Sequence, residues 1–136
     1  MVVFTTADLA YRAFIDVLRI PEWLAVVRQV KVVSRDAEER AERVAFRSWV
    51  GDRDVRFDLI YRYDVARRHV EWRSPEESER RFAGSASFEP LAGRRCLLHY
   101  EIVEEASEAV PNPAALPVWT DSAWVAMKSF RDWVGR

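Results

Sequence analysis

The sequence LPVWTDSAWVAMKSFRDWV (residues 116–134) carries its apolar residues at helical spacing. At about 100° per residue, one stripe collects Leu116, Trp119, Ala123, Met127, Phe130 and Val134, with Ala126 and Trp133 along its edge. A helix of about 18 residues is about 27 Å long, enough to lie across the sheet of a small domain. We therefore predict a long amphipathic helix that closes the fold.

Two short helices are predicted near the amino terminus. The β-prone run Met1–Phe4 is followed by Thr5 and Thr6, whose hydroxyls can cap a helix. Apolar residues recur at helical spacing from Leu9 to Leu18, and Pro21 then begins a second short helix that runs to Val26. We expect a bent helical pair.

Between these helices and the terminal one, the apolar period changes to two, which is typical of strands. Turn-forming residues, such as Gly51-Asp52 and Ser74–Ser78, separate the runs. The predicted strands are Gln29–Val33, Arg43–Val50, Val55–Val65, His69–Arg73, Arg81–Phe88 and Cys96–Val103. Strands gathered together with helices at the ends predict an α+β fold with a curved antiparallel sheet of six to seven strands, counting the short first one.

The composition fits one domain covering residues 1–136, because 49% of the residues are hydrophobic and a chain of this length can bury a sizeable core. The formal net charge of −1 gives no field that would hold nucleic acid or an anionic membrane. Cys96 cannot form an internal disulfide, and the opening MVVFTTADLA lacks the pattern of a secretion signal. The expectation is a cytoplasmic protein without stable membrane insertion.

Several segments, in this order, resemble the helix-grip (SRPBCC) superfamily, which includes START domains, Bet v 1-like allergens and bacterial polyketide cyclase/dehydrase-like or coenzyme-Q-binding-like proteins. They are Ile20–Leu24, the hairpin through Gly51, Val70–Trp72, Gly84–Pro90, Leu98–Glu101 and Ser129–Trp133. The resemblance covers nearly the whole chain. It implies a helix-grip fold, with a ligand space between the sheet and the terminal helix, and leaves the function open, because members bind varied ligands and only some are enzymes. Ala86 departs from the large ring common at this position, which implies either a larger cavity or room for Trp72 or Trp119.

Alternation along the predicted strands places mainly apolar side chains on the inner face of the sheet. It places no carboxylate, lysine or arginine there. Such a cavity can hold an apolar ligand and orient one or two of its oxygens. Polar contacts are expected from Ser48, Tyr61, Tyr63 and Tyr100. Cavity walls are expected from Phe57, Trp72, Phe88, Trp119, Met127 and Phe130. The alternative is that these rings simply pack the core.

No catalytic residue is predicted, because proton transfer needs a titratable group with a suitable pKa and a tyrosine is a poor base at neutral pH. His69 and His99 alternate to the outer face, beside Glu71 and Glu101, where surface pairing is the expected role. No metal or cofactor is predicted, because the histidines and Cys96 are not spaced as ligands.

Three hypotheses remain. The first is a module that binds a hydrophobic small molecule of the lipid, quinone or aromatic polyketide type. The second is a polyketide cyclase or dehydrase, in which positioning and a tyrosine hydrogen bond stabilise an enolate. The third is a protein-interaction module that uses Trp49 and Ile60 on the outer face, for which a homodimer is one expected state.

Overall fold

The computed structural model describes residues 1–78, 81–105 and 123–135. The elements at the ends of the chain are β1 (Val2–Val3), α1 (Ala7–Ile15), the 3₁₀ turn η1 (Val17–Arg19), α2 (Ile20–Trp23) and α4 (Ala123–Val134). The elements between them are β2 (Val27–Arg35), β3 (Ala41–Val50), β4 (Arg53–Asp64), the 3₁₀ turn η2 (Val65–Arg67), β5 (His69–Arg73), β6 (Arg81–Leu91) and β7 (Arg95–Glu105). This order confirms the predicted α+β class.

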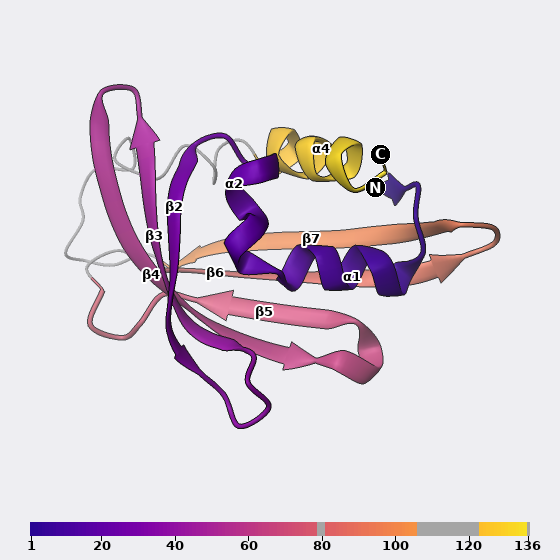
Figure 1. Cartoon of the computed structure of the whole chain (residues 1–136), viewed down its shortest axis with the longest axis horizontal. Helices are drawn as coiled ribbons and strands as arrows, with labels where there is room; N and C mark the ends of the chain where they lie inside the picture. The colour runs from indigo at the N-terminus through magenta and orange to yellow at the C-terminus, as the bar shows by residue number, and fades with distance from the viewer. Residues whose placement is uncertain (79–80, 106–122, 136) are drawn as a thin grey trace.

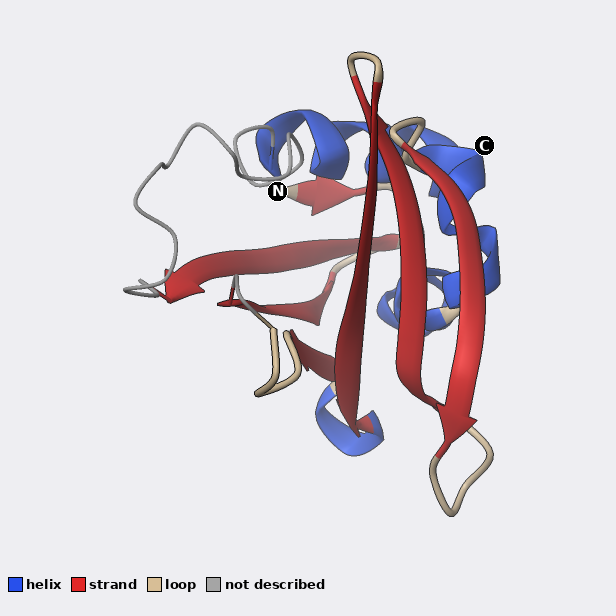
Figure 2. Ribbon diagram, turned by 90° about the vertical axis from the view of Figure 1, so that its left-hand side faces the viewer, coloured by secondary structure: helices blue, strands red, loops and turns tan. Residues whose placement is uncertain are grey.

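The strands form a seven-stranded sheet within the described residues, in the order β1-β7-β6-β5-β4-β3-β2. All neighbouring strands are antiparallel. The β2–β3–β4 part crosses the β5–β6–β7 part, so the sheet is strongly curved, and the helices lie together on one side of it (Figure 1; Figure 2). This curvature creates the space in which the core lies.

Helix α1 begins as predicted, and its core face contains Ala10 and Phe14 of the predicted stripe but not Leu9. The Thr6 hydroxyl accepts a hydrogen bond from the Leu9 N–H at 3.3 Å, which confirms the expected cap. The helix ends at Ile15, not at Leu18, because Asp16 leaves the helical conformation. The aromatic rings of Tyr11 and Phe14 take the core face, and Leu9 is therefore exposed.

The second helix and one strand also end earlier than predicted. Helix α2 has proline in its first turn, as expected, but ends at Trp23 because Leu24 is extended. Strand β4 ends at Asp64, whose carboxylate accepts a hydrogen bond from the Arg67 N–H and starts the turn η2. Val65, predicted as a strand residue, lies in that turn and is exposed.

Helix α4 closes the core with the predicted stripe. Ala126, Met127 and Phe130 are buried, and Trp133 packs against them from the edge. The part of the predicted helix that contains Leu116 and Trp119 lies outside the described residues. None of the described helices has the length and apolar content needed to cross a membrane.

Candidate functional site

A small cavity lies between the concave face of the sheet, α2 and α4. Its volume is about 30 Å³, which corresponds to about one water molecule. Five of the predicted ligand residues line it: Phe57, Tyr61, Trp72, Tyr100 and Met127. The sheet–helix space predicted from the sequence therefore exists, but side chains occupy most of it.

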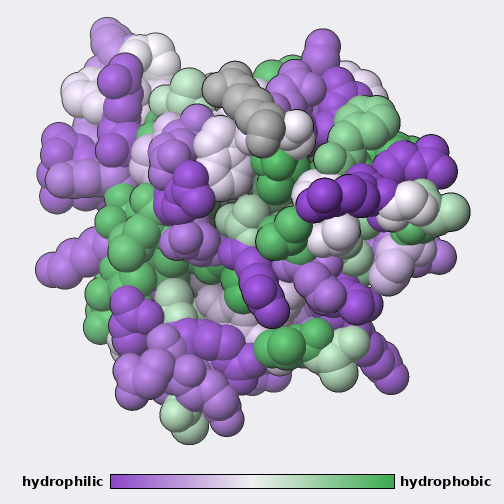
Figure 3. Space-filling model, turned by 45° about the vertical axis from the view of Figure 1, so that its right-hand side comes forward, coloured by the Kyte–Doolittle hydropathy of each residue, from purple (hydrophilic) through white to green (hydrophobic). Residues whose placement is uncertain are grey.

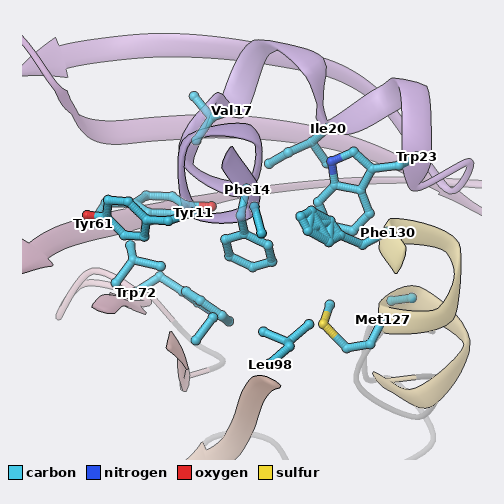
Figure 4. Packing of buried hydrophobic residues seen from close by; sticks show 14 of the residues in the cluster. Tyr11, Phe14, Val17, Ile20, Trp23, Tyr61, Trp72, Leu98, Met127 and Phe130 are labelled. Atoms are coloured by element: carbon cyan, nitrogen blue, oxygen red, sulfur yellow. The ribbon is translucent and has the colours of Figure 1, made fainter. Parts of the chain in front are cut away.

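The ring of Phe14 fills the centre of this space. Its centroid is 5.8 Å from the rings of both Trp23 and Trp72, and Figure 4 shows the two indoles on opposite sides of it. Phe130 approaches from α4, with its centroid 5.3 Å from Phe14 and 5.1 Å from Trp23. The predicted residue Phe88 is buried behind Phe14, at 5.7 Å. Phe88 and Phe130 thus support the cavity and do not line it.

The contribution of α1 and α2, and that of Ala126 on α4, was not predicted from the sequence. Phe14, Ile20 and Trp23 line the cavity from α1 and α2, and Ala126 does so from α4. Phe14 stands on the predicted apolar stripe, and Trp23 lies in the segment quoted for its family resemblance. Both signals were available, but alternation along strands says nothing about how far a neighbouring helix reaches.

Tyr63 does not act as predicted. Its hydroxyl donates a hydrogen bond to the backbone oxygen of Ala41 at 2.6 Å, and the Arg40 guanidinium lies 5.2 Å from its ring centroid. Ser48 is buried on the inner face, as alternation predicted, but it does not line the cavity. Trp119, the remaining predicted residue, lies outside the described residues.

The polar groups of the cavity wall are uncharged. Burial raises the pKa of the hydroxyls of Tyr61 and Tyr100 far above the ordinary value of a tyrosine, so both stay protonated at neutral pH. No charged side chain is found among the described residues that line the cavity. The wall can therefore donate hydrogen bonds but has no group suited to take a proton.

Within residues 1–78, 81–105 and 123–135, four buried side-chain polar atoms have no hydrogen-bond partner. They are the hydroxyls of Tyr11 and Ser48 and the indole Nε1 atoms of Trp23 and Trp72. Leaving such a group unpaired costs about 1–3 kcal/mol. Two of the four, Trp23 and Trp72, belong to cavity-lining residues, and nothing in the sequence pattern indicated that their indole nitrogens are unpaired.

Trp72 is positioned by a glycine on the neighbouring strand. A Cβ atom at Gly84 would lie only 2.4–2.5 Å from Cε2, Cζ2 and Nε1 of Trp72, so the indole lies directly on the backbone of β6. Ala86 is fully buried between its strand partners Val70 and Tyr100. The space that Trp72 occupies is therefore provided by Gly84 and not by Ala86. The small side chain of Ala86 does not leave a large cavity either.

The two histidines lie away from the cavity, on the outer face. His69 Nε2 is 3.1 Å from Glu71 Oε1, as expected, whereas His99 Nε2 is 3.1 Å from Glu89 Oε2. His99 and Glu101 both lie exposed on the outer face, as predicted, but the histidine ring makes its contact across to Glu89 on β6. Among the described residues, no group of three or more His, Cys, Asp or Glu side chains is arranged to hold a metal ion.

Comparison with known proteins supports the fold and goes no further. No protein-family model and no curated protein sequence matches the chain. Solved structures do match. A START superfamily protein from Mycobacterium smegmatis has a TM-score of 0.82 at 16% identity, over 98% of this chain and 92% of that one.

Two further structures have the same architecture. The Zhui aromatase/cyclase from a Streptomyces species has a TM-score of 0.79 at 18% identity, over 100% of this chain and 90% of its own. Ara h 8.0201 has a TM-score of 0.72 at 9% identity, over 98% and 93%. The chain thus has the helix-grip fold predicted from its sequence.

Proposed function

We propose that this helix-grip chain binds a hydrophobic small molecule of the lipid, quinone or aromatic polyketide type between the sheet and α4. The observation that carries the proposal is the wall of the central cavity, which combines apolar and aromatic side chains with Tyr61 and Tyr100 and has no charged side chain among the described residues. Sites for small apolar ligands are built in this way, with few polar groups that orient the ligand.

Binding requires the cavity to open. Its volume of about 30 Å³ is well below the roughly 300–1,000 Å³ typical of ligand pockets. Met127, a flexible side chain on the wall, and the ring of Phe14 are the groups that must move. Because only the opened form binds, the apparent affinity is lowered by the fraction of molecules that are open.

The test is a titration with a quinone, a fatty acid and an aromatic polyketide, followed by tryptophan fluorescence and native mass spectrometry. Ala126→Leu adds volume to a side chain on the cavity wall, and we expect it to weaken binding about tenfold or more. Val125→Leu, on the exposed side of the same helix, is the matched control and should bind as the wild type does. If no compound shifts the fluorescence or stays bound in the mass spectrum, the proposal is wrong.

A polyketide cyclase is the second candidate. Its support is the pair of protonated hydroxyls, Tyr61 and Tyr100, which can donate to the oxygen of a developing enolate. The fold is compatible with such chemistry, since the Zhui structure is an aromatase/cyclase. With an aromatic polyketide that turns over, Tyr61→Phe and Tyr100→Phe should each slow the reaction. Unchanged rates in both variants would show that the tyrosine hydroxyls do not stabilise the enolate.

The interaction module has weaker support. Trp49 is 38% exposed, but the strand register places Arg47 and Arg56, and then Asp58, between it and Ile60. The two apolar side chains therefore do not form a continuous surface. Figure 3 shows one face of the molecule, on which hydrophobic (green) side chains form separate groups among hydrophilic (purple) ones. A dimer in gel filtration that Trp49→Ser abolishes would restore this hypothesis.

A further inference from the structure

We infer that the bound molecule is uncharged and offers a hydrogen-bond acceptor, such as a ketone oxygen on an aromatic ring, to the indole N–H groups of Trp23 and Trp72. The inference rests on the proposed function and narrows its ligand class. It favours neutral aromatic molecules that carry a hydrogen-bond acceptor over fatty acids. The apolar wall alone would accept both classes.

The first argument is that the cavity wall contains two indole N–H donors without a hydrogen-bond partner among the described residues. Trp23 and Trp72 are 7% and 4% exposed, and neither Nε1 has a hydrogen-bond partner among the residues that the structure describes. An indole N–H can donate but cannot accept, so a ligand that brings only donors leaves it unpaired. Tyr61 and Tyr100 add protonated hydroxyls to the same wall. An acceptor oxygen would therefore pair with donors that the described side chains leave unpaired.

The second argument is the position of the two indoles. Trp23 comes from α2 and Trp72 from β5, and their rings stand on opposite sides of Phe14, each 5.8 Å from it between centroids (Figure 4). Both belong to the cavity wall. A flat ring that displaces Phe14 would take its place stacked between the two indoles, against a wall to which both residues with unpaired N–H groups belong.

The third argument excludes an anionic head group. Burying a carboxylate is unfavourable unless a cation pairs with it. The described part of the cavity wall contains no lysine, arginine or histidine. Arg19 and Arg40 contact rings at the edge of the core, but they already pair with Glu22 at 2.9 Å and Asp36 at 3.2 Å. A fatty acid would thus bury its charge without a partner.

The test uses three naphthalenes of similar size: 2-acetylnaphthalene, 2-ethylnaphthalene and 2-naphthoate, titrated into the full chain by calorimetry. We expect the ketone to bind about tenfold more tightly than the hydrocarbon, and the carboxylate to bind more weakly than both. If the hydrocarbon binds as tightly as the ketone, or the carboxylate binds best, the inference is wrong while the proposed function stands. If none of the three binds, the inference fails, and the titration with a quinone, a fatty acid and an aromatic polyketide decides the proposed function separately.

Nuclear magnetic resonance of the indole N–H groups then locates the contact. Trp23→Phe and Trp72→Phe identify the two signals, and each should reduce the advantage of the ketone over the hydrocarbon. In the wild type, the ketone should shift both signals and leave that of Trp124 unchanged, because this indole is 66% exposed on the outer side of α4. Shifts at Trp124 alone would show surface binding and overturn the inference, whether or not the variants fold.

Discussion

The indole of Trp72 lies where a side chain on residue 84 would be. Gly84→Ala places a Cβ 2.4 Å from Cε2 of that ring, so the ring must move into an already packed core. We expect the free energy of unfolding to fall by about 1–3 kcal/mol, the usual cost of overpacking, measured by urea denaturation. Ser85→Ala, next to Gly84 and facing the outer side, is the control and should change little.

A double variant tests whether the contact with Trp72 is the cause. In Trp72→Phe the smaller ring should tolerate the added methyl group, so Gly84→Ala should cost less in that background than in the wild type. We expect a coupling of about 1 kcal/mol, within the range observed for residues in contact. Additive losses would mean that Gly84 acts through its backbone and not through Trp72.

The hydroxyl of Tyr63 gives a second prediction for a single residue. It donates to the Ala41 oxygen at 2.6 Å, and in Tyr63→Phe that oxygen loses its partner. We expect a loss of about 0.5–1.5 kcal/mol in the free energy of unfolding, with ligand binding unchanged. Tyr61→Phe is the matched variant on the same strand and should instead affect binding, because Tyr61 lines the cavity. A change in affinity for Tyr63→Phe would return this residue to the site.

At the scale of the elements, strands were more predictable than helices. Alternation and turn residues are local signals, and they predicted β5 correctly, together with the inward direction of Tyr61 and Trp72. The face of α1 was not fixed locally, because Leu9 and Phe14 both fit an apolar stripe and only packing against the sheet selects the aromatic side. The same limit explains Tyr63, which points inward as predicted but finds its acceptor on a neighbouring strand.

Helix α4 carries one fully buried ring, Phe130. This ring contacts those of Phe14, Trp23 and Phe88. Phe130→Ala should therefore lower the free energy of unfolding by about 3–5 kcal/mol in urea denaturation. Trp124→Ala, on the same helix but 66% exposed, should cost little. Equal losses in the two variants would show that α4 is stabilised by its own helix propensity more than by docking on the core.

At the scale of the whole molecule, we expect function to depend on a few interior side chains more than on the fold. The same architecture appears in the Mycobacterium, Streptomyces and Ara h 8.0201 structures at identities of 9–18%. Such distances mean that core identity can change while the curved sheet and its helix persist. In this chain the space between the sheet and the helices is filled by Phe14, Trp23 and Trp72, and we expect ligand selectivity to depend on these three rings.

The response of stability to alkaline pH is a property of the whole core. All four tyrosines, Tyr11, Tyr61, Tyr63 and Tyr100, have pKa values raised by burial above the ordinary value near 10. Below about pH 10 both the folded and the unfolded chain keep these protons, and stability is unaffected. Above it the unfolded chain releases them first, so the free energy of unfolding should fall as pH rises, by up to about 1.4 kcal/mol per pH unit for each tyrosine.

Other groups contribute less to this decline. The chain has only two lysines, Lys31 and Lys128, and its arginines stay charged in this range. Burial also raises the pKa of the Cys96 thiol, which adds a fall of the same sign from slightly lower pH, and Cys96→Ala removes it. Urea denaturation between about pH 8 and pH 11, in the Cys96→Ala background, should show a slope that becomes shallower in Tyr100→Phe. A slope that Tyr100→Phe leaves unchanged would mean that this hydroxyl ionises as freely in the folded chain as in the unfolded one, and that the interior around the cavity is open to water.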